Sequence, residues 1–483
     1  MKAIVSITTL SLLLVTFACA FNTNGDMDLV LLPESTSPGG RCMDGSMAGY
    51  YIRDGVEDSN LFVIYLKGGG ACSTEEDCDK RLNTSLGSSD YWRDTNQGTG
   101  FLDADCTQNP SFCEATAVFV NYCTGDTHRG TRTQPSELTY GYYFDGHTNF
   151  AAIIDKLITE KGLDEPDTKV LLTGGSAGAI GAIFNIDWLA DKLENASVKG
   201  VPVAGWYWPA ALDYDLPEPF NPSDYEHFAN NENGNSIYDA YMQDNSVVLP
   251  DLWGMKDMLS EECLVDHTDV FWFACASAHY AYPYIKSSLF NVHTQYDNNQ
   301  LSSQNGAPLG PTSTSEMDTV KEYMEMWGYA TRQSLQLIVQ DASDIDKSHP
   351  DGIFSASCMT HGTSRDTLID GHNYMEIAHD WFFQNGEFED QYKLIESCPE
   401  ESDLGEQLPC NAAKNCQYDP LSRLPPMART CFLEIDMAGC LETTVDNEEQ
   451  CLQCLRDNKR EIYQRGCRRV RLAKKICKYA HKA

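Results

Sequence analysis

The sequence predicts an α/β fold with a mainly parallel central sheet that helices cover on both faces. Between residues 60 and 385, apolar runs typical of strands alternate with segments whose apolar residues recur at helical spacing. Such alternation is typical of βαβ units. Several strand candidates are continuous apolar runs, as expected for strands buried on both faces. Expected strands are 61–66, 117–122, 170–173, 201–206, 289–293 and 353–357; expected helices are 145–161, the segment after 173 through 188, 269–285, 315–338 and 371–383.

The composition limits the partners of the chain. Charged residues make up 22% and hydrophobic residues 42%, which is ordinary for a globular protein. The net charge of −36 and the pI near 4.5 argue against nucleic acid as a partner, because a polyphosphate is repelled. Residues 456–483 are the exception: they carry +9, which leaves −45 on the rest. Acidic glycans are therefore the candidate partner of this basic tail.

Residues 1–20 are predicted to be a signal peptide, a signal segment that is removed on export. Lys2 supplies the positive start, residues 3–17 are apolar, and Ala18-Cys19-Ala20 has the small-x-small cleavage pattern. The alternative is an uncleaved membrane anchor. No later run approaches the ~20 apolar residues that span a bilayer. We therefore expect a secreted protein without a membrane span.

Cysteine usage agrees with export. Removal of Cys19 leaves eighteen of the nineteen cysteines, enough for up to nine disulfides in an oxidising compartment. Nine of them lie between Cys398 and Cys477, so at least one bridge must join that region to the rest if all pair within the chain. The sequence predicts a main domain over 21–395 and a small, disulfide-rich, basic helical region over 396–483. Zinc ligation is the alternative for the last four cysteines, Cys451, Cys454, Cys467 and Cys477. Asn83 and Asn195 begin N-glycosylation triplets.

The sharpest motif is Gly174-Gly175-Ser176-Ala177-Gly178, which lies between a strand and a helix rich in small residues. A nucleophile elbow needs this context, because the turn is tight and the helix packs closely on the strand. Ser176 is therefore the candidate nucleophile. The alternative is a glycine-rich turn with a bystander serine.

A second glycine-rich segment, Lys67-Gly68-Gly69-Gly70, follows the first buried strand directly. Esterases use such a loop, whose backbone N–H groups are unobstructed, as part of the oxyanion hole, with a second donor from the residue after the nucleophile, here Ala177. The spacing does not fit a phosphate-binding loop. An ordinary turn remains the alternative.

A serine nucleophile needs a base and an orienting acid, and nine of the eleven histidines follow Ser176. His361 ends a strand-like segment, and Asp297 follows another strand by a short loop. Both therefore fall at the carboxyl edge of the sheet, where open α/β sheets place their sites. Position alone makes His361 a candidate for the base but does not decide between it and the other histidines. His279 and His293 are expected to be structural or exposed.

Five segments, taken together, resemble the pectin acetylesterase/Notum family of secreted carboxylesterases, which has an α/β-hydrolase-like fold. They span about residues 41–383 and appear in the family's order: RCMDGSMAGYY (41–51), YLKGGGACSTEEDCDKR (65–81), VFVNYCTGDTHRG (118–130), LTGGSAGAIGAIFNIDWL (172–189), and VHTQYDNNQL (292–301) with ASCMTHGTSRDTLIDGHNYMEIAHDWF (356–382).

The resemblance implies a serine–histidine–aspartate mechanism without a cofactor or metal. The family's serine, acid and histidine fall on Ser176, Asp297 and His361, and its oxyanion donors fall on Gly69, Gly70 and Ala177. The chain departs from the family pattern in two places. An acidic residue usually precedes the glycines where Lys67 stands, and a Trp is missing at Gly70-Ala71, so the shape of the acyl pocket is left open.

Two substrates follow from the resemblance: acetyl groups on a pectin-like polysaccharide, or a palmitoleoyl group on a secreted signalling protein. We favour polysaccharide deacetylation, because the triple glycine is more similar to the pectin enzymes, although a −45 domain repels acidic pectin at low salt unless its cleft is locally basic. Two further functions fit the same motifs: a non-catalytic glycan-binding protein on an esterase scaffold, and a peptidase that uses the same three side chains.

Overall fold

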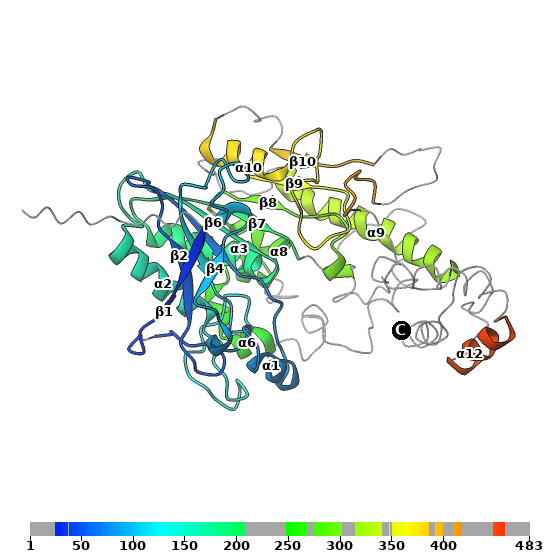
Figure 1. Ribbon diagram of the computed structural model, residues 1–483, viewed down its shortest axis with the longest axis horizontal. Helices are drawn as coiled ribbons and strands as arrows, with labels where there is room; N and C mark the ends of the chain where they lie inside the picture. The colour runs from blue at the N-terminus through cyan, green and yellow to red at the C-terminus, as the bar shows by residue number, and fades with distance from the viewer. Residues whose placement is uncertain are drawn as a thin grey trace, which may run out of the picture.

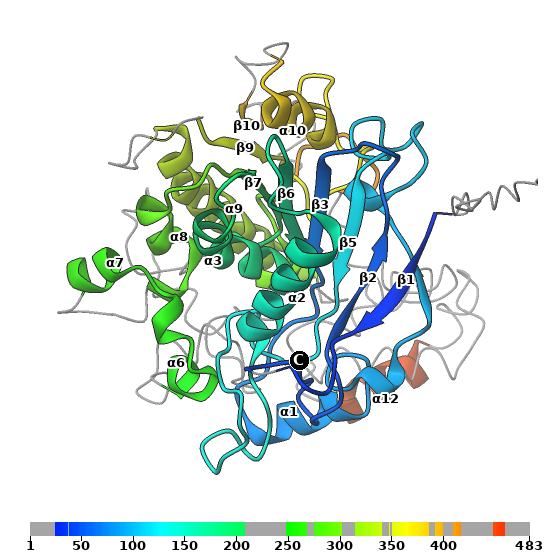
Figure 2. The same ribbon diagram turned by 90° about the vertical axis from the view of Figure 1, so that its left-hand side faces the viewer.

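The computed structural model describes residues 25–36, 38–207, 248–267, 275–301, 314–340, 347, 350–385, 392–398, 409–416 and 448–458. The predicted signal segment and most of the basic tail lie outside these residues. Within them, a single ten-stranded sheet has the order β10-β9-β8-β7-β6-β3-β5-β2-β1-β4 (Figures 1 and 2). The strands are β1 (Asp26–Leu31), β2 (Gly49–Arg53), β3 (Leu61–Leu66), β4 (Thr95–Gln97), β5 (Thr116–Val120), β6 (Lys169–Gly175), β7 (Ser197–Val203), β8 (Phe290–Val292), β9 (Gly352–Ser355) and β10 (Lys393–Ile395).

The sheet is parallel from β10 to β5 and antiparallel beyond it. Strands β3, β5, β6, β7, β8, β9 and β10 pair in parallel, whereas β2, β1 and β4 extend the sheet as an antiparallel edge. The central strands β3 and β6 are buried along most of their length, which agrees with their continuous apolar sequences. The predicted fold class is confirmed.

Helices cover both faces of this sheet. The helices that do so are α2 (Gly146–Lys161), α3 (Ala177–Lys192), α9 (Thr314–Val339) and α10 (Tyr374–Phe383), while α1 (Glu75–Leu82) and α12 (Glu448–Asp457) contribute to neither of the two cores on the sheet. Apolar side chains of α2, α3 and α9 share one core with Phe62, Ile64 and Leu66 of β3. On the opposite face, α10 packs in a second core that contains Val63 of the same strand. Figure 2 shows α2 and α3 beside the sheet and α10 at its far end.

Local sequence fixes the ends of several helices. Asn373 caps α10: its side chain accepts from the N–H groups of Met375 and Glu376, and Glu376 reaches back to the Asn373 N–H. Helix α2 ends at Gly162, which adopts the left-handed conformation with φ of 71°. These caps satisfy backbone groups that a helix end otherwise leaves without partners.

Most of the predicted elements are present, and three differences have physical causes. The antiparallel strands β1, β2 and β4 were not predicted. Strand β4 is three polar residues at the edge of the sheet, β1 has two aspartates among its apolar residues, and β2 is only five residues long and begins with a glycine. The strand expected at 201–206 is β7, which begins earlier and stops before Ala204, whose φ is 58°. In place of one helix over 269–285, the described part holds α8 (Ala278–Ala281), which gives way to a 3-10 turn containing Pro283.

Six disulfides are present among the described residues: Cys42–Cys123, Cys72–Cys78, Cys106–Cys113, Cys263–Cys275, Cys358–Cys416 and Cys398–Cys410. Cys358–Cys416 is a bridge between the main domain and the cysteine-rich region, as the cysteine count predicts. Cys451 and Cys454, two of the four cysteines weighed as zinc ligands, are also disulfide-bonded. The domain boundary near residue 395 stays a prediction.

Candidate active site

Ser176 lies in a sharp turn between β6 and α3. Its backbone φ of 57° and ψ of −124° are strained for a residue with a side chain, as a nucleophile elbow requires. The flanking glycines permit the turn, because a Cβ on Gly178 would collide with the Leu66 carbonyl and a Cβ on Gly174 with the Gly178 carbonyl. The small residues of the motif therefore let α3 pack directly on β3 and β6.

The glycine loop after β3 packs against this elbow. A Cβ on Gly68 would collide with the Gly175 carbonyl and lie 3.1 Å from Ser176 Cβ. Gly69 and Gly70 have φ of 145° and 67°, which side chains disfavour. The loop can therefore approach the nucleophile only because these positions are glycine.

Two side chains hold the carbonyl groups of this loop. Arg81 of α1 donates from Nη2 to the Gly69 oxygen at 3.0 Å, and the Tyr122 hydroxyl donates to the Gly70 oxygen at 2.8 Å. The Thr127 N–H in turn donates to the Tyr122 hydroxyl at 2.7 Å. The guanidinium of Arg81 lies 5.5 Å from the centre of the Tyr122 ring. Both carbonyls are thus fixed from within the protein.

The predicted oxyanion donors are available for a ligand. Within the described part of the chain, the backbone N–H groups of Gly69, Gly70 and Ala177 donate to no protein acceptor. Ala177 is the first residue of α3, where a backbone N–H has no acceptor inside the helix. The partial positive charge of this helix end faces the same region.

Asp297 and His361 lie in direct contact. His361 Nδ1 is 2.8 Å from Asp297 Oδ2 and 3.0 Å from Oδ1, and the Asp297 side chain is fully buried. The N–H groups of Asn299 and Gln300 also donate to Asp297 Oδ1, at 2.8 and 3.2 Å. Burial lowers the pKa of His361, but the hydrogen bond and charge of Asp297 outweigh it, so that this pKa is raised above its usual value.

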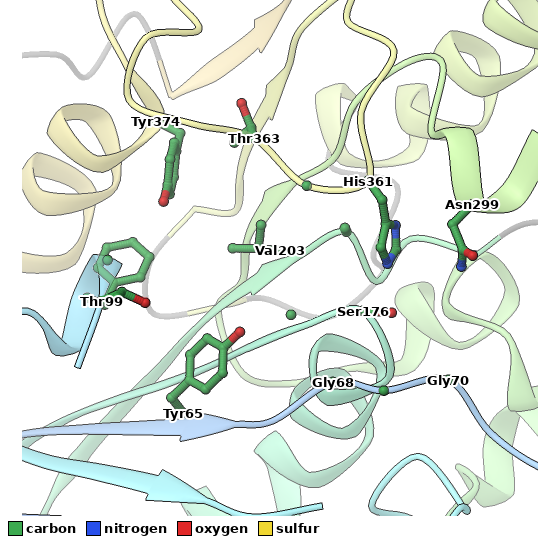
Figure 3. A pocket seen from close by; sticks show the side chains of 16 residues that line it. Tyr65, Gly68, Gly70, Thr99, Ser176, Val203, Asn299, His361, Thr363 and Tyr374 are labelled. Atoms are coloured by element: carbon green, nitrogen blue, oxygen red, sulfur yellow. The ribbon is translucent and has the colours of Figure 1, made fainter. Parts of the chain in front are cut away.

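Ser176 and His361 line the same cavity, and Figure 3 shows the imidazole beside the serine. The structure gives no direct hydrogen bond between the two described side chains, which is common before a substrate binds. The Tyr207 hydroxyl, which accepts a hydrogen bond from Asn299 Nδ2 at 2.9 Å, also lies near Ser176. Burial and the charge of Asp297 raise the pKa of Tyr207, so that it stays a neutral phenol.

The cavity beside Ser176 has a volume of about 580 Å³, which is in the range of small-molecule sites. The glycine loop, Ser176 and His361 form one end. At the other, Figure 3 shows Tyr65 and Tyr374 on opposite walls with Thr99 nearby. Among described residues, those lining it are Tyr65, Gly68, Gly69, Gly70, Thr99, Gly100, Phe101, Gly175, Ser176, Val203, Ala204, Asn299, His361, Gly362, Thr363 and Tyr374.

Sequence reasoning missed Tyr207, Asn299 and the tyrosines of the cavity wall. Tyr207 and Asn299 carried the same signal as Asp297, since both follow a strand at the carboxyl edge of the sheet. Tyr65 and Tyr374 carried no such signal. His293, expected to be structural or exposed, is buried; burial lowers its pKa to about 4, so it is neutral.

In the described residues, no group of three or more histidine, cysteine, aspartate or glutamate side chains is arranged to hold a metal ion. None of the helices in that part of the chain is long and apolar enough to cross a bilayer.

The fold and the geometry of this site define an α/β-hydrolase-like protein. Its fold is similar to that of the Wnt deacylase Notum from Drosophila, with a TM-score of 0.61, 24% identity, and 77% of this chain and 97% of that chain covered. The family model for pectinacetylesterase matches residues 20–404. The chain therefore belongs to the pectinacetylesterase family, and it is a carboxylic ester hydrolase.

Two relatives illustrate the breadth of this similarity. Pectin acetylesterase 4 of Arabidopsis thaliana is 26% identical over 426 residues, which cover 83% of this chain and 94% of the relative. Palmitoleoyl-protein carboxylesterase NOTUM of Drosophila melanogaster is 29% identical over 331 residues, 66% of this chain. The match spans 43% of the length of that second relative.

Proposed function

We propose that this protein is a secreted serine carboxylesterase that removes O-acetyl groups from an extracellular polysaccharide such as pectin. The observation that carries the proposal is the 2.8 Å contact between His361 and the buried Asp297, placed at the cavity that Ser176 also lines. The disulfides and the predicted signal segment support secretion, since paired cysteines persist in oxidising compartments.

In the acylation half of the proposed reaction, Ser176 Oγ attacks the ester carbonyl while His361 Nε2 accepts its proton. Asp297 holds Nδ1–H, which leaves Nε2 as the basic nitrogen. The carbonyl oxygen becomes an oxyanion that the N–H groups of Gly69, Gly70 and Ala177 stabilise. Collapse of this intermediate breaks the bond to the alcohol, and His361 returns the proton to the leaving oxygen.

In the deacylation half, water attacks the acyl-Ser176 carbonyl. His361 accepts a proton from that water, and the same backbone donors stabilise the second oxyanion. The Ser176–acyl bond then breaks, the serine regains its proton from His361, and the carboxylic acid leaves. No metal or organic cofactor takes part in any step.

The main alternative is removal of a long acyl group from a secreted protein, as the name of the Drosophila relative describes for that protein. The triple glycine at 68–70 favours a polysaccharide substrate. Turnover of p-nitrophenyl esters from acetyl to palmitoyl separates the two: we expect the acetyl ester to be preferred by at least tenfold in kcat/KM. Preference for palmitoyl would contradict the proposal.

The proposed nucleophile can be tested by active-site labelling. A fluorophosphonate probe is expected to label the wild-type protein at Ser176, and Ser176→Ala is expected to abolish labelling and to lower kcat on p-nitrophenyl acetate by at least about 10³-fold. Ser364→Ala, near the cavity but outside the proposed mechanism, is the control. Labelling that survives in Ser176→Ala would show that another residue is the nucleophile.

A further inference from the structure

The cavity is larger than an acetyl group requires, and its far wall has a distinct chemistry. Beyond Ser176, the wall consists of Tyr65, Thr99, Phe101 and Tyr374. We refer to these four residues as the aromatic arm. Figure 3 shows the labelled side chains Tyr65 and Tyr374 facing this space from opposite sides, with Ser176 and His361 at one end.

The rings of the arm are held rigidly. Tyr65 stacks on Phe119, with ring centres 5.5 Å apart and planes 12° apart. Tyr374 meets Phe101 edge-to-face at 5.9 Å. The Tyr65 hydroxyl also reaches the nucleophile elbow, since it lies 2.7 Å from where a Cβ on Gly175 would be. A ligand in the arm would therefore be directly adjacent to the reacting serine.

Three hydroxyl groups in the arm have no protein partner among the described residues. The structure gives no hydrogen bond for the hydroxyl of Tyr65 or for that of Tyr374, a residue that is 8% exposed. Thr99 occupies the N-cap of a 3-10 turn, yet its side chain makes no capping hydrogen bond. Burial raises the pKa of Tyr65 and raises that of Tyr374 to about 12, so both remain neutral.

These hydroxyls distinguish between ligand classes. An alkyl chain in the arm would take three hydroxyls out of water without giving them partners, which costs free energy. A sugar ring offers hydroxyls to pair with them and apolar C–H faces to pack on the aromatic rings. The arm therefore suits the alcohol part of the substrate rather than a long acyl chain.

The arm also lacks charge. No lysine, arginine, aspartate or glutamate is among the described residues that line the cavity. A free carboxylate brought there would lose hydration without a countercharge on the cavity wall, since the guanidinium of Arg365, whose charge lowers the pKa of Tyr374, is not among the lining residues. A sugar ring that binds in the arm is therefore expected to be uncharged. Neutral sugars and methyl-esterified uronates both meet this condition.

We infer that the aromatic arm binds an uncharged pyranose ring of the polysaccharide next to the acetylated position, with Tyr65 and Tyr374 hydrogen-bonding its hydroxyls. This inference rests on the proposed function and adds the substrate class of the subsite.

Tyr65→Phe and Tyr374→Phe test it, because both keep the ring and the packing. On an O-acetylated xylo-oligosaccharide we expect KM to rise about three- to tenfold in each variant. The ratio of kcat/KM on this ester to kcat/KM on p-nitrophenyl acetate, which has no sugar, should fall by about the same factor. Tyr91→Phe, at an exposed tyrosine outside the cavity, is the matched control and should change neither. Equal losses on both esters, or no change on the sugar ester, would overturn the inference.

A second pair of substrates tests the absence of charge. One substrate is an acetylated oligogalacturonide whose methyl esters are intact. The other is the same oligosaccharide after enzymatic removal of the methyl groups. We expect the methyl-esterified form to have at least a tenfold higher kcat/KM; preference for the free acid would overturn the uncharged subsite. Failure of the proposed function itself would have a different result: the wild-type protein would neither be labelled at Ser176 nor hydrolyse p-nitrophenyl acetate.

Discussion

At the scale of single residues, the proposed chemistry depends on the contact between Asp297 and His361. Asp297 is fully buried and accepts two backbone N–H groups besides His361 Nδ1. Its position is therefore fixed before a substrate arrives, and His361 is held in the tautomer whose Nε2 is basic. Burial by itself would lower the pKa of His361, so the raised pKa depends on this one carboxylate.

The pH dependence of activity follows from that balance. Because His361 must be neutral to accept a proton, kcat/KM of the wild type should fall as the pH drops through its raised pKa, which lies above 6.5. Asp297→Asn removes the carboxylate hydrogen bond and the negative charge that raise the pKa of His361. The fall of activity at acid pH should therefore move to lower pH. The variant should also lose about 10⁴-fold in kcat, since the tautomer is no longer fixed.

A pH profile of p-nitrophenyl acetate hydrolysis measures both effects. Asp366→Asn removes an exposed carboxylate five residues from His361 and is the control for a general change in charge. An acid limb that stays in place in Asp297→Asn would show that another group titrates.

At the scale of elements, the glycine loop acts as part of a larger unit with α1 and the segment after β5. Arg81 and Tyr122 hold the carbonyls of Gly69 and Gly70, and the disulfide Cys72–Cys78 joins the end of the loop to α1. The direction of the free N–H groups is thus fixed by contacts that lie outside the glycines. We regard Arg81 and Tyr122 as positioning residues for the proposed oxyanion hole.

Tyr122→Phe tests this coupling. The change removes the hydrogen bond to the Gly70 carbonyl and leaves the Thr127 N–H without its acceptor. Because a single oxyanion donor contributes about 10²–10³ in kcat, a displaced loop should lower kcat on p-nitrophenyl acetate about tenfold and change KM little.

The matched control is Tyr140→Phe, whose hydroxyl donates to the Ser73 carbonyl beyond the three glycines. A purely structural role of Tyr122 would instead lower the midpoint of unfolding and leave kcat of the folded fraction unchanged.

At the scale of the whole molecule, the cysteine-rich region is joined to the edge of the sheet that carries the proposed catalytic residues. Cys358 lies three residues before His361 and is bonded to Cys416, and both are buried in the core that contains α10. The Met359 N–H donates to the Cys416 carbonyl at 3.0 Å. Residues 409–416 thus support the segment that carries His361.

Removing two disulfides separately measures this support. Cys358–Cys416 spans 58 residues and Cys106–Cys113 spans 7, so the longer loop should stabilise the fold by about 2 kcal/mol more through the entropy of the unfolded chain. Guanidinium unfolding of the two double serine variants gives the difference. Only the variant at 358 and 416 should also lose activity at guanidinium concentrations below its unfolding midpoint. Equal losses of stability and activity in the two variants would contradict the idea that Cys358–Cys416 supports the segment that carries His361.

Much of the fold followed from the sequence because buried parallel strands and amphipathic helices have distinctive patterns. Strand β3, helix α2 and helix α9 lie close to their predicted bounds. The antiparallel strands β1, β2 and β4 did not follow, since all three are short and β1 and β4 contain polar residues, so that their patterns are weak. Tyr65 was predicted only as part of a strand, because its sequence neighbourhood does not show which distant ring faces it.

The sequence by itself determined the elbow around Ser176, because a strand, a glycine-flanked turn and a helix are adjacent in the chain and local sterics dictate their geometry. The pairing of Asp297 with His361, 64 residues apart, depends on β8 and β9 being neighbours in the sheet. The aromatic arm likewise joins β3 to the start of α10. Only the tertiary structure decided these contacts, because the order of strands in space is set by the packing of the whole core.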